Sequence, residues 1–223
     1  MNEHLRVLYE AAFPTFGEIA AGSEKVSWPL LLEVPEGYSS VPVKLLVVGQ
    51  ETRGWGSGVP RDVEEVVALY RAFELGRWYR ATPFWQAVHR LHRLLNPDAP
   101  PRAFLWSNLV KVSQHKTRPS PVVEEAVCRL GLLRAEIRIT RPDAIVFFTG
   151  SSYDGRLRET FPGAALDRLS RFVSRVRHEE LPWHSYRTSH PNYLRLSGNW
   201  QVLEEIASQV AGGREPAEPG RCT

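Results

Sequence analysis

Four short runs of consecutive apolar residues mark the chain at wide intervals. They cover residues 43–48, 103–106 and 144–148, and a weaker run covers residues 185–188. Runs of this length are typical of strands that are buried on both faces of a parallel sheet. The sequence therefore predicts four buried strands.

Amphipathic segments separate these runs. Asp62 and Glu65 have the spacing of a capping box, and a proline follows both Thr82 and Ser120, at the first position of a helix. Asn199 is of a residue type that caps a further helix. The predicted helices cover residues 62–76, 82–95, 120–142 and 199–206.

The alternation of strands and helices predicts the fold class. We expect one α/β domain over residues 1–211, built as a three-layer α/β/α sandwich around a short, mainly parallel, four-stranded central sheet. Residues 212–223 are rich in glycine, proline and charge, so a disordered tail is expected there. Such sheets bind ligands at the carboxyl ends of their strands, where a functional site is therefore expected.

The composition of the chain excludes several classes of protein. The 223 residues carry a formal net charge of +3 and have a pI of about 9.0, which permits a nucleic-acid partner. Two cysteines, Cys128 and Cys222, are too few for a disulfide scaffold, a four-cysteine zinc site or an iron–sulfur cluster. The sequence has no signal-peptide pattern and no apolar stretch of the roughly 18 residues that a membrane helix needs. We expect a cytoplasmic monomer without cofactor or metal.

Each predicted strand is followed by a polar side chain that could do chemistry. Glu51, Asn108, Ser151 and His190 follow the four strands in order. A single glutamate or histidine in a loop is usually a solvated residue or a cap. Four such side chains at one edge of a sheet favour a site. The glycine-rich turn at residues 49–56 matches neither a P-loop nor a dinucleotide fingerprint, and no metal spacing or Gly-x-Ser-x-Gly elbow is present.

The four segments together resemble the uracil-DNA glycosylase superfamily, in the same order and from about residue 43 to residue 205. The uracil-excising branch of that family carries Gly-Gln-Asp-Pro-Tyr, Leu-Leu-Leu-Asn, a Trp-Gly-Ser-Tyr type of turn and His-Pro-Ser-Pro-Leu. The corresponding segments are Gly-Gln-Glu-Thr-Arg at 49–53, Leu-Trp-Ser-Asn at 105–108, Thr-Gly-Ser-Ser-Tyr at 149–153 and His-Pro-Asn-Tyr-Leu at 190–194.

The resemblance implies hydrolysis of the bond between a base and its deoxyribose. Glu51 takes the place of the carboxylate that positions water, although it is one methylene longer than the family's aspartate. His190 takes the place of the histidine that donates a hydrogen bond to the base carbonyl, and Asn108 that of the asparagine that reads the base. The backbone N–H of Gln50 is expected to face the base as well.

The resemblance also implies base flipping and contacts with DNA. Leu194 takes the place of the leucine that fills the space left by the flipped base; the alternative is that it packs beneath the last helix. The basic loop after the second strand either binds phosphate or is simply solvated. The remaining expected DNA contacts are Lys111, Lys116, Arg118, Ser151, Tyr193 and Arg195.

Two departures from the family pattern bear on the substrate. The uracil-excising branch has a tyrosine that excludes 5-substituted pyrimidines, and Arg53 stands at that position here. A guanidinium leaves the 5-position open and can bind a polar substituent, such as a hydroxymethyl or sugar group. Aromatic residues are also concentrated between the first two motifs, where one or two could stack on the flipped base: Tyr70, Phe73, Trp78, Tyr79, Phe84 and Trp85.

The sequence favours a monofunctional DNA glycosylase for a modified pyrimidine, and bacteriophage DNA, in a host-defence setting, is one source of such bases. A lyase activity would need an amine nucleophile, for which Lys111 is a weak candidate. Three alternatives stay open at this point: ordinary uracil repair, a non-catalytic module that binds DNA, and an α/β protein for a free base or nucleoside.

Overall fold

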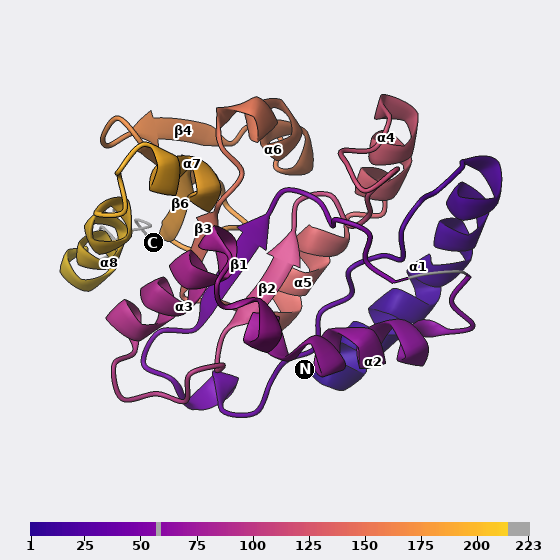
Figure 1. The fold of residues 1–223 in the computed structure, drawn as a ribbon, viewed down its shortest axis with the longest axis horizontal. Coiled ribbons are helices and arrows are strands. Elements are labelled where there is room, and N and C mark those ends of the chain that lie inside the picture. The colour runs from indigo at the N-terminus through magenta and orange to yellow at the C-terminus, as the bar shows by residue number, and fades with distance from the viewer. Residues whose placement is uncertain (57–58, 214–223) are drawn as a thin grey trace, which may run out of the picture.

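The computed structural model describes residues 1–56 and 59–213 and contains a six-stranded mixed sheet (Figure 1). The strand order is β2-β1-β3-β6-β5-β4, and β2, β1, β3 and β6 run parallel. β4 and β5 add an antiparallel hairpin at one edge. The strands are β1 (Leu45–Gly49), β2 (Leu105–Asn108), β3 (Ala144–Phe147), β4 (Ala165–Arg168), β5 (Val173–Arg177) and β6 (His184–Thr188).

The four parallel strands confirm the α/β class, but the expectation of a four-stranded sheet was wrong. β5 alternates between buried and more exposed positions, and β4 is nowhere fully buried. Arginines such as Arg175 and Arg177 occupy the outward positions of β5. An edge hairpin with one face exposed to solvent therefore lacks the continuous apolar run that is typical of the inner strands.

Helices flank the sheet (Figure 1). Helix α3 packs against α7 and α8, whereas α1 packs against α2, α4 and α5. The helices are α1 (Asn2–Gly22), α2 (Val63–Phe73), α3 (Pro83–Leu95), α4 (Pro121–Arg129), α5 (Leu132–Thr140), α6 (Asp154–Thr160), α7 (Pro191–Leu196) and α8 (Val202–Gly212), with 3-10 turns at Tyr38–Ser40, Glu74–Tyr79 and Ser151–Tyr153.

The predicted helix signals place most helix starts correctly. Asp62 Oδ1 accepts a hydrogen bond from the backbone N–H of Glu65 at 2.8 Å, as the capping box requires. The single helix expected over residues 120–142 is instead two helices, because Gly131 has a φ of +63° and interrupts the helical backbone between them.

Helices lie near both ends of the described chain. An amphipathic helix, α1, begins at Asn2 and buries one side against the domain. Gly212 still belongs to α8, and Gly213 donates its N–H to the carbonyl of Gln209. The rest of the predicted tail, with Cys222, lies outside the described residues. Within the described part of the chain, no helix is both long and apolar enough to cross a membrane.

Candidate active site at the strand ends

The parallel strands bring the four polar segments together. Gly49 and Asn108 are register partners at the ends of β1 and β2, and the Leu109 N–H donates to the carbonyl of Gly49 at 2.9 Å. The side-chain amide of Gln50 reaches across to the carbonyl of Thr149 at 2.8 Å, just beyond β3. In turn, the Gly150 N–H donates to Thr188 O at the end of β6. The four strand ends therefore form one continuous polar rim.

Asn108 lies at the bottom of this rim. Its side chain is only 2% exposed, and its Nδ2 has no hydrogen-bond partner among the described residues. A Cβ at Gly49 would come within 2.4 Å of Asn108 Oδ1, so the glycine makes room for the amide. A buried donor without a partner costs about 1–3 kcal/mol. The arrangement suits an amide that is held ready for a polar ligand.

His190 follows the end of β6 and is the N-cap of α7. Its Nδ1 accepts a hydrogen bond from the backbone N–H of Asn192 at 3.2 Å. Burial lowers the pKa of His190 below its usual value of 6.5, and the positive charge of Arg53 lowers it further. The neutral imidazole therefore carries its proton on Nε2, which is left to donate.

Phe84, at the start of α3, supplies an aromatic wall. Its ring lies nearly parallel to the imidazole of His190, with 6.0 Å between centroids and 25° between planes. The same ring comes within 3.5 Å of the position that a Cβ of Gly49 would take. Phe84 is therefore a member of the aromatic segment that stacks on His190 and borders Gly49, the register partner of Asn108. Tyr70 and Trp85 are instead buried in the core.

Glu51 is partly buried at the rim and is held from the side of β3. The hydroxyl of Tyr153 donates a hydrogen bond to Glu51 Oε2. Burial raises the pKa of Tyr153, and the neighbouring Glu51 carboxylate raises it further. The guanidinium of Arg118 lies 4.3 Å above the Tyr153 ring. Tyr153 was not singled out for a role in the sequence, because its contact with Glu51 joins residues that are 102 positions apart.

The loop that carries Glu51 is anchored on both sides. The hydroxyls of Ser27 and Thr52 are 2.9 Å apart, and the N–H of Gly54 donates to Ser113 Oγ at 3.2 Å. Thr52 is buried by these contacts, whereas Arg53 remains exposed at the rim. The anchoring fixes the backbone on either side of Arg53 and leaves its side chain in solvent.

The predicted DNA contacts other than Leu194 divide into three groups. Lys116 and Ser151 are exposed near the rim, as are Tyr193 and Arg195 on α7. Arg118 is exposed as well, but its guanidinium already makes two hydrogen bonds to Glu124, at 2.7 and 2.8 Å. Lys111 alone forms the third group, since it is buried.

The expectation that Lys111 contacts DNA was wrong. Its side chain is 3% exposed, and its Nζ lies 2.5 Å from Glu136 Oε2. Glu136 also accepts hydrogen bonds from Tyr9 and Ser107, each at 2.9 Å. The amine is therefore part of the polar core beneath β2. In this position it can reach neither a phosphate nor a sugar carbon.

Leu194 corrects a second expectation, because it is fully buried. The segment after His190 forms a helix, so side chains three positions apart share a face. Tyr193 and Leu196 take the outward face of α7 and are 53% and 71% exposed. The predicted wedge position therefore packs inward, and the exposed apolar residues of α7 are its neighbours.

The residues described by the structure contain no group of three or more histidine, cysteine, aspartate or glutamate side chains that could hold a metal ion. The site is built from one carboxylate, one imidazole, one amide and an aromatic ring. Comparison with models of protein families finds no match to this chain, and neither does comparison with curated proteins.

Proposed function

We propose that the chain is a monofunctional DNA glycosylase with the three-layer fold of the uracil-DNA glycosylase superfamily. It flips a base out of DNA and hydrolyses the N-glycosidic bond, which leaves an abasic site. The observation that carries the proposal is the buried Asn108 amide, whose Nδ2 has no hydrogen-bond partner among the described residues, with Phe84 bordering the same glycine, Gly49. An amide donor and acceptor in a slot beside an aromatic ring fits the edge and face of a flipped base.

Glu51 acts on the sugar side in this proposal. Cleavage builds positive charge on the deoxyribose, and a carboxylate near it stabilises that charge and accepts a hydrogen bond from the attacking water. The water oxygen bonds to the sugar carbon, its proton passes to Glu51, and the electron pair of the broken bond leaves with the base. The hydrogen bond from Tyr153 restrains the longer glutamate side chain to one position.

His190 acts on the base side. The departing base gains negative charge on its carbonyl oxygen, which needs a hydrogen-bond donor. The neutral imidazole presents Nε2–H for this purpose, because Nδ1 is occupied by the Asn192 N–H. The lowered pKa of His190 supports a neutral donor at physiological pH.

Arg53 points to the substrate class. Its exposed guanidinium lies close enough to His190 for its charge to lower the imidazole pKa. Arg53 stands where the uracil-excising branch has its excluding tyrosine, so a pyrimidine with a polar group at carbon 5 is the substrate that we propose. Hydroxymethylated and glucosylated cytosines of bacteriophage DNA belong to that class, and excising them would serve host defence.

The test is mass spectrometry of bases released from a panel of DNAs. The panel holds uracil-containing DNA, unmodified DNA, and phage DNAs with hydroxymethylated or glucosylated cytosine. Glu51→Gln should abolish release, whereas Glu18→Gln, an exposed position on α1, is the matched control and should leave it intact. Release of uracil alone would make the protein a uracil repair enzyme and overturn the role of Arg53. No release with DNA binding retained would make it a binding module, and no DNA binding at all would indicate a free base or nucleoside as ligand.

A further inference from the structure

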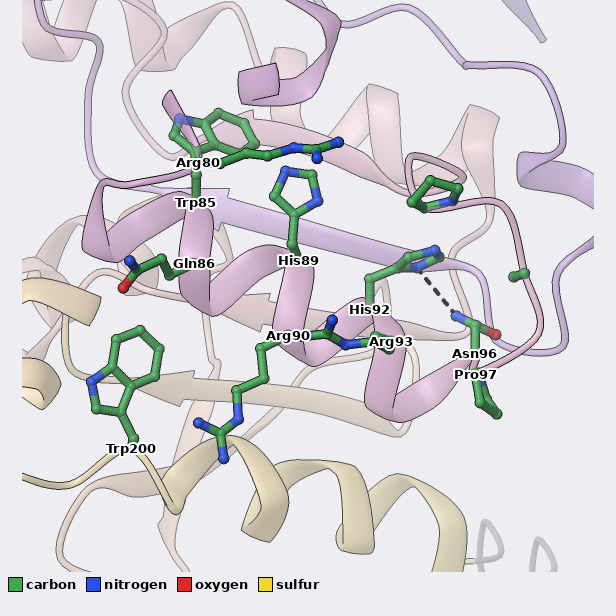
Figure 2. A pocket seen from close by; sticks show the side chains of 12 residues that line it. Arg80, Trp85, Gln86, His89, Arg90, His92, Arg93, Asn96, Pro97 and Trp200 are labelled. Atoms are coloured by element: carbon green, nitrogen blue, oxygen red, sulfur yellow. Dashed lines mark hydrogen bonds between the residues drawn. The ribbon is translucent and has the colours of Figure 1, made fainter. Parts of the chain in front are cut away.

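A cleft of about 710 Å³ runs along α3 and lies outside the strand-end site (Figure 2). We call it the α3 cleft. Its volume is in the range of ligand-binding clefts, about 300–1,000 Å³. None of the residues proposed above for base excision lines it. Among the residues that line it are Arg80, Trp85, His89, Arg90, Arg93 and Trp200.

The lining of the α3 cleft is cationic. Three of its residues are arginines and none is a carboxylate. Arg90 is committed to Glu204, whose Oε1 lies 2.9 Å from Arg90 Nε. Arg80 and Arg93 are both exposed and have no ion pair among the residues that the structure describes. Two guanidinium groups without an ion pair, in a concave surface whose lining carries no carboxylate, attract an anion.

Polar and aromatic groups accompany the free arginines. Figure 2 shows the imidazole of His89 beside the guanidinium of Arg80. His89 is partly buried, and this burial lowers the pKa of its imidazole below the usual value. The half-buried indole of Trp200 lies at the other side of α3 (Figure 2). The His89 imidazole and the Trp200 indole can form hydrogen bonds with a nucleic acid and stack on its bases, in addition to the attraction between charges.

The α3 cleft and the strand-end site adjoin along the chain. Phe84 stacks on His190 within the site, and the next residue, Trp85, already lines the cleft. Trp200 follows α7, the helix that His190 caps. Since α3 has 13 residues, the cleft can follow it for about 20 Å at roughly 1.5 Å per residue. That length spans several nucleotides of a strand.

We infer that the α3 cleft binds the phosphodiester backbone of single-stranded DNA that continues from the nucleotide held at the strand ends. Arg80 and Arg93 neutralise phosphates, and Trp200 stacks on a base. The inference rests on the proposed function, because the direction of the strand is taken from the excision site. It adds a strand-binding surface that the chemistry at Glu51 and His190 does not require.

The test uses fluorescence anisotropy with a labelled 12-nucleotide oligodeoxyadenylate. This probe contains no pyrimidine, so binding is read whether or not the protein excises one. The double variant Arg80→Gln/Arg93→Gln should raise the Kd on the order of tenfold. It should also reduce the slope of log K against log salt by about 1.4, since each phosphate contact with a single strand contributes about 0.7. Both positions are exposed, so the variant should unfold at the wild-type temperature.

Arg138→Gln/Arg141→Gln removes the same charge from exposed positions on and after α5, remote from the α3 cleft, and is the matched control. It should change neither the Kd nor the salt slope beyond the effect of net charge. An equal loss in the control, or an unchanged Kd in the Arg80 and Arg93 variant, would overturn the inference. Displacement of the probe by deoxyadenosine monophosphate or inorganic phosphate at equal phosphate concentration would also overturn it, in favour of a small anion as the ligand. If the wild-type protein bound the oligonucleotide but released no base from any DNA of the panel, that result would count against the proposed function alone.

Discussion

The hydroxyl of Tyr153 donates a hydrogen bond to the carboxylate of Glu51, across the gap between the ends of β3 and β1. Glutamate has one more rotatable bond than aspartate, so a carboxylate in this place needs a restraint before it can position a water molecule. Arg118 covers the other side of the Tyr153 ring and is itself fixed by Glu124. The tyrosine is therefore a positioning residue for the proposed reaction.

Tyr153→Phe should reduce the single-turnover rate of base release by about tenfold, because a displaced carboxylate misplaces the water. Rate constants at saturating DNA measure this effect, and anisotropy measures the Kd, which should stay unchanged. Tyr38→Phe also removes a buried hydroxyl, remote from the site, and should leave both quantities as in the wild type. A Tyr153→Phe protein with the wild-type rate would show that the hydrogen bond has no role in positioning.

The pH dependence of base release should report on His190. Its pKa lies below 6.5, so the imidazole is neutral at pH 7 and becomes charged only as the pH falls through that lowered value. Protonation of Nδ1 removes the acceptor for the Asn192 N–H and disturbs the N-cap of α7. The rate should therefore be flat near neutrality and fall on the acid side.

Arg53→Gln should move that acid limb to higher pH. Removing the positive charge eliminates one of the two causes that lower the pKa of His190, so the pKa rises towards 6.5. Rate profiles between pH 5 and 8 measure the shift, and Arg195→Gln on α7 serves as a control for general charge. A shift to lower pH, or equal shifts in both variants, would contradict the electrostatic link between Arg53 and His190.

Gly49→Ala tests whether the Asn108 amide has to lie where it does. The added methyl group would come within 2.4 Å of Asn108 Oδ1 and push the amide out of place. We expect loss of base release together with a destabilisation of about 1–3 kcal/mol, measured by denaturant unfolding. Gly155→Ala on α6 adds the same methyl group into open space and should be neutral or stabilising by about 0.5–1 kcal/mol. Full activity of Gly49→Ala would remove Asn108 from the proposed site.

The parallel strands and most helix starts could be predicted because their signals are local. Buried strands have continuous apolar runs, and Asp62 and Thr82 precede helices that begin where the sequence predicts. The hairpin of β4 and β5 could not be predicted in the same way, because its outward positions carry arginines such as Arg175. Nor could the break at Gly131, since a single glycine within an apolar pattern is compatible with a continuous helix.

The candidate site, like the fold, could be predicted from the sequence only in part. The convergence of Glu51, Asn108 and His190 follows from parallel strands, whose carboxyl ends share one edge of the sheet. The burial of Lys111 could not be read from its position after β2, because its partner Glu136 comes from a helix 25 positions away. Tyr153 was hidden for the same reason.

The exposed face of α7 gives the last prediction. If the protein inserts an apolar side chain into DNA, the exposed Leu196 rather than the buried Leu194 is placed to do it. Leu196→Ala should therefore weaken base release from duplex DNA more than from single-stranded DNA, with an unchanged melting temperature. Leu194→Ala should instead lower the stability by about 2–5 kcal/mol, as is typical when a buried leucine leaves a cavity. Thermal unfolding and release rates on both kinds of DNA measure these effects. If Leu196→Ala left the ratio of duplex to single-strand rates unchanged, α7 would not supply a wedge through this residue.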